Sequence, residues 1–209
     1  MRDPWGALAL IPALAACGSP DRPELDYLPP SGAPAPSRSA FVQQQSWLVW
    51  GNLLDHLQQQ GLQLADLDEP SGEIVVAYAG DPEPYVDCGW IISYDDDDLD
   101  RVPAARSEAS FARRFDGDLV MLERDLRLAA RINVKLEPDG EATVVRADST
   151  YLLTKIVTPE GSEEPLHEET IRFETGESAS FVSTTTCQAN GGLERSVLDA
   201  LPAVSLADG

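Results

Sequence analysis

The sequence predicts an α+β domain, in which an antiparallel β-sheet carries helices on one face in a helix-grip-like arrangement. Residues 126–137 alternate strictly between apolar and polar side chains, which is typical of a strand with one buried face. A Pro-Asp-Gly turn at 138–140 and a second strand over 142–157 complete a hairpin. Apolar residues at helical spacing after Ser46 predict a helix that covers the sheet.

The first helix is predicted to begin at Ser46, which is a suitable N-cap. Its apolar residues recur every three or four positions. They are Trp47, Trp50, Leu53, Leu54 and Leu57. We expect both tryptophans to lie in the core, because they share one stripe with the leucines. Strands at 62–64 and 73–79 are predicted to follow this helix.

The second half of the chain contributes the remaining predicted elements. The segment 88–94 is expected to be a strand, whereas 95–125 shows no clear period. Two strands at 170–174 and 180–185 are expected to form a hairpin around Gly176. A last helix is predicted over 191–201.

The N-terminus has the pattern of a secretory signal peptide. An apolar run covers residues 5–16, is too short to span a bilayer, and ends in Leu14-Ala15-Ala16-Cys17. These four residues resemble the lipobox of bacterial lipoproteins, in which the cysteine thiol is acylated and the chain is then cut before that cysteine. An ordinary buried helix is the alternative, and Pro12 argues against it.

Three segments are therefore predicted: a lipoprotein signal peptide at 1–16, a Pro-rich flexible tether at 17–40, and a single domain at 41–209. The tether is rich in Pro, Ser, Gly and Ala, which bury too little apolar surface to fold alone. Its apolar exceptions are Leu25, Tyr27 and Leu28. They form a candidate partner-binding segment, and a plain spacer is the alternative.

The chain is strongly acidic, with 36 Asp and Glu against 15 Lys and Arg and a formal net charge of −21. Such a charge repels nucleic acid and anionic lipid surfaces, so nucleic acid is not an expected partner. We therefore expect contact with a lipid bilayer to come from the acyl chains on Cys17.

Two cysteines, Cys88 and Cys187, remain after lipidation of Cys17. In an exported protein such a pair is most simply a structural disulfide. Closing a loop of about 100 residues would stabilise the fold by about 4–5 kcal/mol in the chain-entropy model. The alternative is a nucleophilic Cys88, which would need a histidine brought close by the fold.

No motif in the sequence supports an enzyme. The two histidines, His56 and His167, are isolated, and zinc-protease, serine-hydrolase and phosphate-loop motifs are absent. The aspartates at 95–98 and Asp100 indicate a solvated acidic loop, with weak calcium binding as the alternative. We therefore predict no catalytic residue, no metal and no cofactor.

Residues 46–79 combine an aromatic-led helix, a Gly-Leu strand, an acidic turn and a Gly-led strand ending in tyrosine. The defining positions are Trp47, Trp50, Gly61, Leu62, Asp66, Asp68, Gly72 and Tyr78. This pattern resembles the helix-grip unit of BamC-like lipoproteins, also called NlpB. BamC-like proteins carry two such units, and their N-terminal segment lies along a partner of the β-barrel assembly machine. The resemblance implies an accessory scaffold.

Together these features predict a non-enzymatic lipoprotein anchored in the bacterial outer membrane, facing the periplasm, that binds other envelope proteins. Gly18, directly after Cys17, is typical of lipoproteins sorted to the outer membrane. One alternative is a ligand-binding module with an apolar groove between helix and sheet. Another is an envelope hydrolase, which a histidine clustered with Cys88 or a carboxylate would favour.

Overall fold

The chain is mainly β-structure, so the predicted α+β class is wrong. The computed structural model describes residues 25–32, 38–60, 62–95, 98–115, 118–199 and 201. These ranges contain thirteen strands and only two helices. The strands form three antiparallel sheets of seven, three and three strands. The class was missed because the short strands and those between 98 and 115 carry no strict alternation.

The largest sheet is built on two long strands, β9 (Asp118–Asp139) and β10 (Ala142–Pro159), which confirm the predicted hairpin. β11 (His167–Glu174) pairs with β10 on its other side. β4 (Glu73–Gly80) pairs with β9, and β3 (Gln63–Asp68) pairs with β4. They confirm the two strands expected after the first helix. β2 (Ser39–Val42) pairs with the start of β10, and β8 (Glu108–Phe115) with the start of β9.

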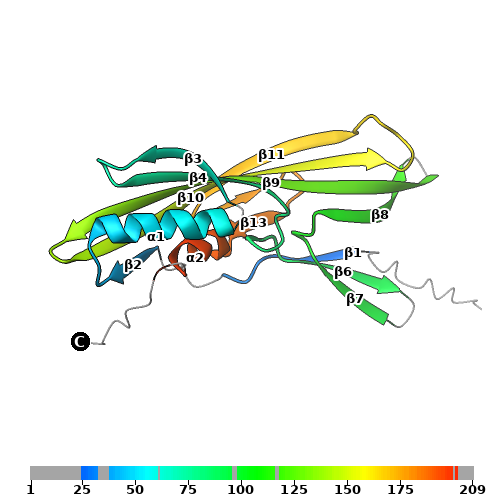
Figure 1. Ribbon diagram of the computed structural model, residues 1–209. Coiled ribbons are helices and arrows are strands. Elements are labelled where there is room, and N and C mark those ends of the chain that lie inside the picture. The colour runs from blue at the N-terminus through cyan, green and yellow to red at the C-terminus, as the bar shows by residue number, and fades with distance from the viewer. Residues whose placement is uncertain are drawn as a thin grey trace, which may run out of the picture.

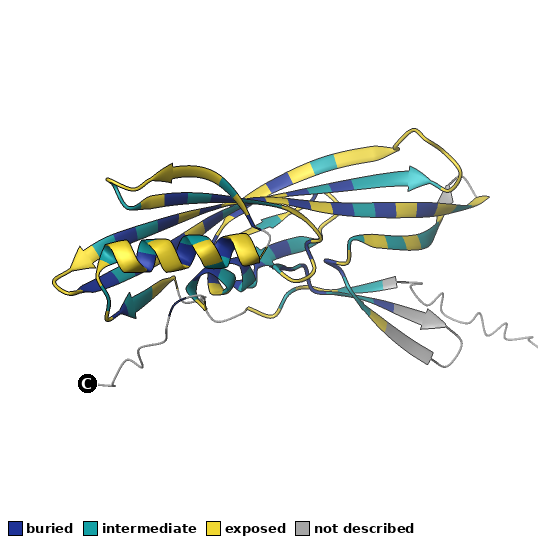
Figure 2. Cartoon of the chain, in the orientation of Figure 1, coloured by how far each residue is buried: buried dark blue, intermediate teal, exposed yellow. Residues whose placement is uncertain are grey.

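Alternation along β9 and β10 separates a buried face from an exposed face, as the banding in Figure 2 shows. Ile132 and Val134 of β9 are buried, whereas Arg131 and Asn133, which alternate with them, are exposed. One face of the long hairpin therefore forms the core and the other meets solvent.

Helix α1 (Ser46–Gln59) packs on the sheet through Val49, Leu53 and Leu57. The buried stripe of α1 differs from the predicted one at the tryptophans, because Trp47 is 62% exposed and Trp50 is half-buried. The expectation that both tryptophans lie in the core is therefore wrong. Helix α2 (Gly192–Leu198) confirms the last predicted helix and contacts β10.

Two small sheets complete the fold. One has the order β1 (Leu25–Leu28), β6 (Trp90–Asp95) and β7 (Asp98–Pro103), and the other has the order β12 (Ser178–Ser180), β13 (Thr186–Ala189) and β5 (Val86–Asp87). The chain turns at Gly176, where φ is 84°, but β12 pairs with β13 and not with β11. The hairpin predicted around Gly176 is therefore wrong.

The molecule is elongated along the direction of β9 and β10 (Figure 1). In this view α1 is drawn in front of the long hairpin and α2 lies below α1, whereas β1, β6 and β7 form an arm at the end where β9 begins. The structure places residues 25–28 and 39–40 of the predicted tether in strands.

Candidate functional site

Cys88 and Cys187 form a disulfide, which confirms the predicted pairing. Cys88 lies between β5 and β6, Cys187 lies in β13, and both side chains are buried. The bond therefore joins the segment that connects the two small sheets to a strand almost 100 residues later. A sulfur in a disulfide has no thiolate, so in this state Cys88 is not a nucleophile. Cys17 lies outside the described residues.

The proposed partner-binding segment forms part of the fold around this disulfide. β1 pairs with β6 over all four of its residues. The Tyr27 hydroxyl donates to the Thr186 carbonyl at 3.1 Å and accepts from the Thr186 N–H at 2.9 Å, next to Cys187. Burial raises the pKa of this hydroxyl. Tyr27 therefore contacts the chain's own strand, while Leu28 is 43% exposed.

Gly89 allows β1 to lie this close to the disulfide. Its φ is 77°, in the left-handed region that favours glycine. A Cβ at this position would collide with the Leu28 carbonyl oxygen and the backbone of Pro29. A side chain at Gly89 would therefore push β1 away from the chain around the disulfide.

The acidic run predicted as a solvated loop lies at the β6–β7 hairpin. Asp95 ends β6, whereas Asp98 and Asp100 lie in β7. Asp96 and Asp97 lie outside the described residues. Within the described ranges, no group of three or more His, Cys, Asp or Glu side chains is placed to hold a metal ion.

One cluster of polar side chains brings a histidine, a carboxylate and a serine together where β10, β11 and the 181–185 loop meet. Lys155 Nζ donates to Ser183 Oγ at 2.7 Å and lies 3.5 Å from Glu169 Oε2. Glu169 also accepts from the Val182 N–H at 2.7 Å, and its Oε2 lies 3.2 Å from His167 Nε2. This combination is the strongest candidate for the hydrolase alternative.

The charges in this cluster argue against a nucleophilic Ser183. Such a serine needs a neutral base that accepts its proton. Burial lowers the pKa of Lys155, but Glu169 acts in the opposite direction and the Phe181 ring lies 4.2 Å from the ammonium. Carboxylate, ring face and hydroxyl all favour the protonated amine, which donates to Ser183. The geometry favours a structural role for Lys155, which holds the 181–185 loop against the sheet.

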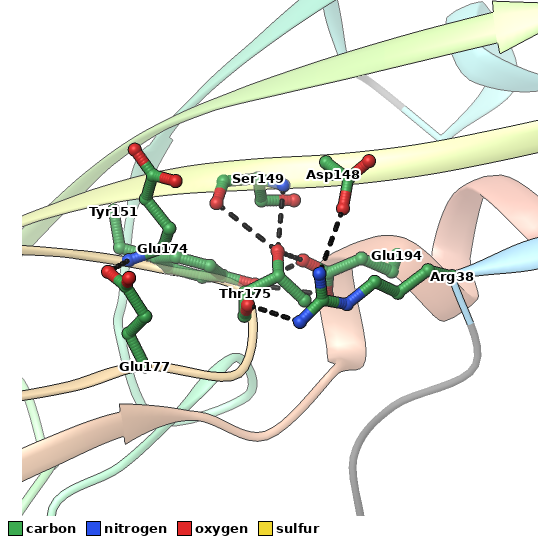
Figure 3. A network of polar contacts seen from close by, with 8 residues as sticks. All are labelled: Arg38, Asp148, Ser149, Tyr151, Glu174, Thr175, Glu177 and Glu194. Carbon is green, nitrogen blue, oxygen red and sulfur yellow. Dashed lines mark hydrogen bonds and ion pairs between the residues drawn. The ribbon is translucent and has the colours of Figure 1, made fainter.

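A buried carboxylate takes part in a network of polar contacts between α2 and the sheet (Figure 3). Glu194 of α2 is fully buried. Its two oxygens each lie 3.0 Å from the Tyr151 hydroxyl, and Oε1 accepts from Thr175 Oγ1 at 2.5 Å. The Ser149 N–H donates to the same Thr175 hydroxyl oxygen at 2.8 Å. Because these donors come from β10 and the turn after β11, the network ties α2 to the sheet.

Arg38 extends this network to the surface. Its Nη2 donates to the Thr175 carbonyl at 2.6 Å, and its Nη1 lies 3.5 Å from Asp148 Oδ1. Burial, followed by the charge of Glu194, raises the pKa of Tyr151 far above its usual range. The Tyr151 ring also stacks on Phe173, with centroids 5.1 Å apart. Sequence reasoning missed all of these residues.

The ligand-binding alternative needs an apolar groove beneath α1. The inner side of this helix is filled by Val49, Leu53 and Leu57, which are at most 1% exposed. A shallow depression of about 250 Å³ lies instead on the opposite, exposed face of β4, β9 and β10. Ion pairs line it, including Lys135 with Glu73 at 2.7 Å. Its lining suits water and ions better than an apolar ligand.

No family model, curated protein or solved structure matches this chain. Across the described part of the chain, no helix is both long enough and apolar enough to cross a membrane.

Proposed function

We propose that this chain is an exported bacterial lipoprotein, held in the outer membrane by acyl chains on Cys17, and that it binds other envelope proteins without a chemical step. The distribution of its three cysteines carries the proposal. Two of them are joined in a buried disulfide, which suits an oxidising compartment. The third is the last residue of the lipobox-like sequence.

The polar clusters support a binding role over a catalytic one. Glu194 accepts hydrogen bonds from Tyr151 and Thr175, and Lys155 is held by Ser183 and Glu169. These side chains are engaged in contacts that join elements of the fold. The resemblance of residues 46–79 to BamC-like lipoproteins supports an accessory role in the envelope, and α1, β3 and β4 follow one another there in the expected order.

The anchor is tested by metabolic labelling with an alkyne palmitate, followed by membrane fractionation of bacteria that express the full chain. Wild-type protein should carry the label and fractionate with the outer membrane. Cys17→Ala should lose both properties. Cys187→Ser is the matched control, since it also removes one cysteine and should keep the label. Unchanged labelling of Cys17→Ala would contradict the proposal.

The absence of a chemical step is tested by complementation of a deletion strain, with detergent sensitivity of the envelope as the readout. Ser183→Ala and His167→Ala should restore resistance as well as wild type does, because both substitutions leave the large surface of the sheet intact. Cys17→Ala should fail. Failure of Ser183→Ala, in protein with its disulfide intact, would restore the hydrolase alternative.

A further inference from the structure

The anchor proposed at Cys17 limits how the domain can lie relative to the membrane. The described chain begins at Leu25, at the outer end of the β1–β6–β7 arm (Figure 1). Eight residue steps separate Cys17 from Leu25, and an extended chain covers at most about 3.6 Å per residue, or about 29 Å in all. Leu25 therefore lies within about 29 Å of the lipid surface if Cys17 is acylated.

The domain is much longer than this connection. β9 contains 22 residues, which at about 3.3 Å per residue makes it about 70 Å long. The start of β9 and the outer end of β1 lie at the same end of the long axis (Figure 1). The anchor therefore keeps one end of the domain, the end with the start of β9, close to the bilayer.

Three exposed apolar side chains lie at this same end. Leu119 and Leu166 are each 58% exposed, and Met121 is 41% exposed. Leu119 and Met121 are two residues apart on β9 and so project from the same face of the sheet. Leu166 precedes β11, where its N–H donates to the Val157 carbonyl of β10 at 2.8 Å. We call these three residues the anchor-end patch.

The charges around the anchor-end patch favour a lipid bilayer as its binding partner. Glu160, Glu163 and Glu164 are exposed in the loop between β10 and β11, beside the anchor-end patch. Two copies that met through these ends would bring the same carboxylates together, in chains that each carry a net charge of −21. A zwitterionic lipid surface meets no such repulsion, and the anchor holds it at high effective concentration.

We propose that the anchor-end patch rests on the lipid bilayer, with Leu119, Met121 and Leu166 inserted at the interface and the domain tilted so that this part of the exposed sheet face meets the lipid. This proposal depends on the lipid anchor proposed for Cys17. The acidic loop restricts the contact to membranes with few anionic headgroups at low salt. The far end of the sheet, at the β9–β10 turn, is then directed away from the membrane.

The test uses full-length lipoprotein, purified from membranes and reconstituted in phosphatidylcholine vesicles with brominated acyl chains. Met121→Cys and, separately, Asp139→Cys are labelled with an environment-sensitive fluorophore. The disulfide and the acylation of Cys17 leave the new thiol as the reactive one. Asp139 is the matched control, because it is an exposed residue at the opposite end of the same strand. Quenching at 121 should exceed that at 139 at least threefold.

A second probe separates the patch from simple proximity. With the label at Glu160→Cys, the double substitution Leu119→Ser/Leu166→Ser should lower quenching at least twofold. Anionic lipid should lower it further at low salt. Protein that fails to float with the vesicles would overturn both the anchor and this proposal. Protein that floats, but shows equal quenching at 121 and 139 or no effect of the double substitution, would overturn this proposal alone.

Discussion

The strands of the long sheet and the strands of the small sheet beside the disulfide are held in place by different interactions. β10 pairs with β9 along all of its 18 residues, across a tight turn, and alternate side chains fill one core. β5, β12 and β13 are two to four residues long and come from segments almost 100 residues apart. They are joined by Cys88–Cys187 and by the contact of Tyr27 with Thr186.

This difference follows from the cost of closing loops. A hairpin closes with few residues in its turn, so its pairing repays a small entropy loss, whereas distant segments lose more on meeting. Three-residue strands bury too little apolar surface to recover that loss alone. The small sheets therefore depend on a covalent bond and specific hydrogen bonds, and the long sheet does not.

The largest expected effect comes from removing the disulfide with Cys88→Ser/Cys187→Ser. The free energy of unfolding should fall by about 4–5 kcal/mol, because a loop of about 100 residues is no longer closed in the unfolded chain. Urea denaturation measures the loss. Hydrogen exchange should accelerate in β5, β12 and β13 by more than the change that easier global unfolding causes in β9 and β10. A loss below 1 kcal/mol, or exchange that accelerates equally everywhere, would contradict the comparison.

Substitutions at two neighbouring residues of β9 test which face of the long sheet is buried. Ile132→Ala should cost about 2–5 kcal/mol of unfolding free energy, since Ile132 is fully buried and its loss leaves a cavity. Arg131→Ala, on the exposed face, should stay within about 0.5 kcal/mol of wild type. Chemical denaturation of both variants checks this. Similar losses at both positions would refute the assignment of faces.

A smaller effect is expected where α2 meets the sheet. Tyr151→Phe leaves the buried Glu194 carboxylate without its Tyr151 donor and should cost about 1–3 kcal/mol. It should also change the pH dependence. The raised pKa of Tyr151 keeps its proton on the folded protein, while the unfolded chain loses it above a pH of about 10.

Wild type should therefore lose stability as pH rises above about 10, by up to about 1.4 kcal/mol per pH unit from this group. The contribution is fully present below that pH, where both states keep the proton. Tyr151→Phe should have a shallower alkaline slope. Unfolding free energies of both proteins between pH 9 and 11 measure the difference, and parallel curves would show that Tyr151 does not titrate with unfolding.

The parts of the fold that the sequence predicted are those where a local pattern repeats. Alternation from 126 to 137 identified the core of β9, and a Pro-Asp-Gly turn identified the hairpin. The fold class was wrong because strands such as β5 and β12 exist only through distant partners. Trp47 was wrongly predicted to be buried because two neighbouring faces of α1 are almost equally apolar in sequence. In the folded protein the buried face is the one with Val49, Leu53 and Leu57.

The candidate site was predicted unevenly for the same reason. Cysteine number and an exported context were enough to pair Cys88 with Cys187. Only one weak feature of the sequence pointed to the Glu194 network. Glu194 is a charged residue directly after Leu193, which lies on the apolar stripe of the last helix. The position of β1 depends on Gly89 and Thr186, which lie more than 60 residues away and carry no local signal.

Mass spectrometry of the protein purified from membranes without reduction shows whether it is both acylated and disulfide-bonded. We expect a chain that begins at Cys17, carries acyl groups on that residue, and yields a linked peptide containing Cys88 and Cys187. A chain that still begins at Met1, with an unmodified Cys17 and free thiols at Cys88 and Cys187, would contradict it.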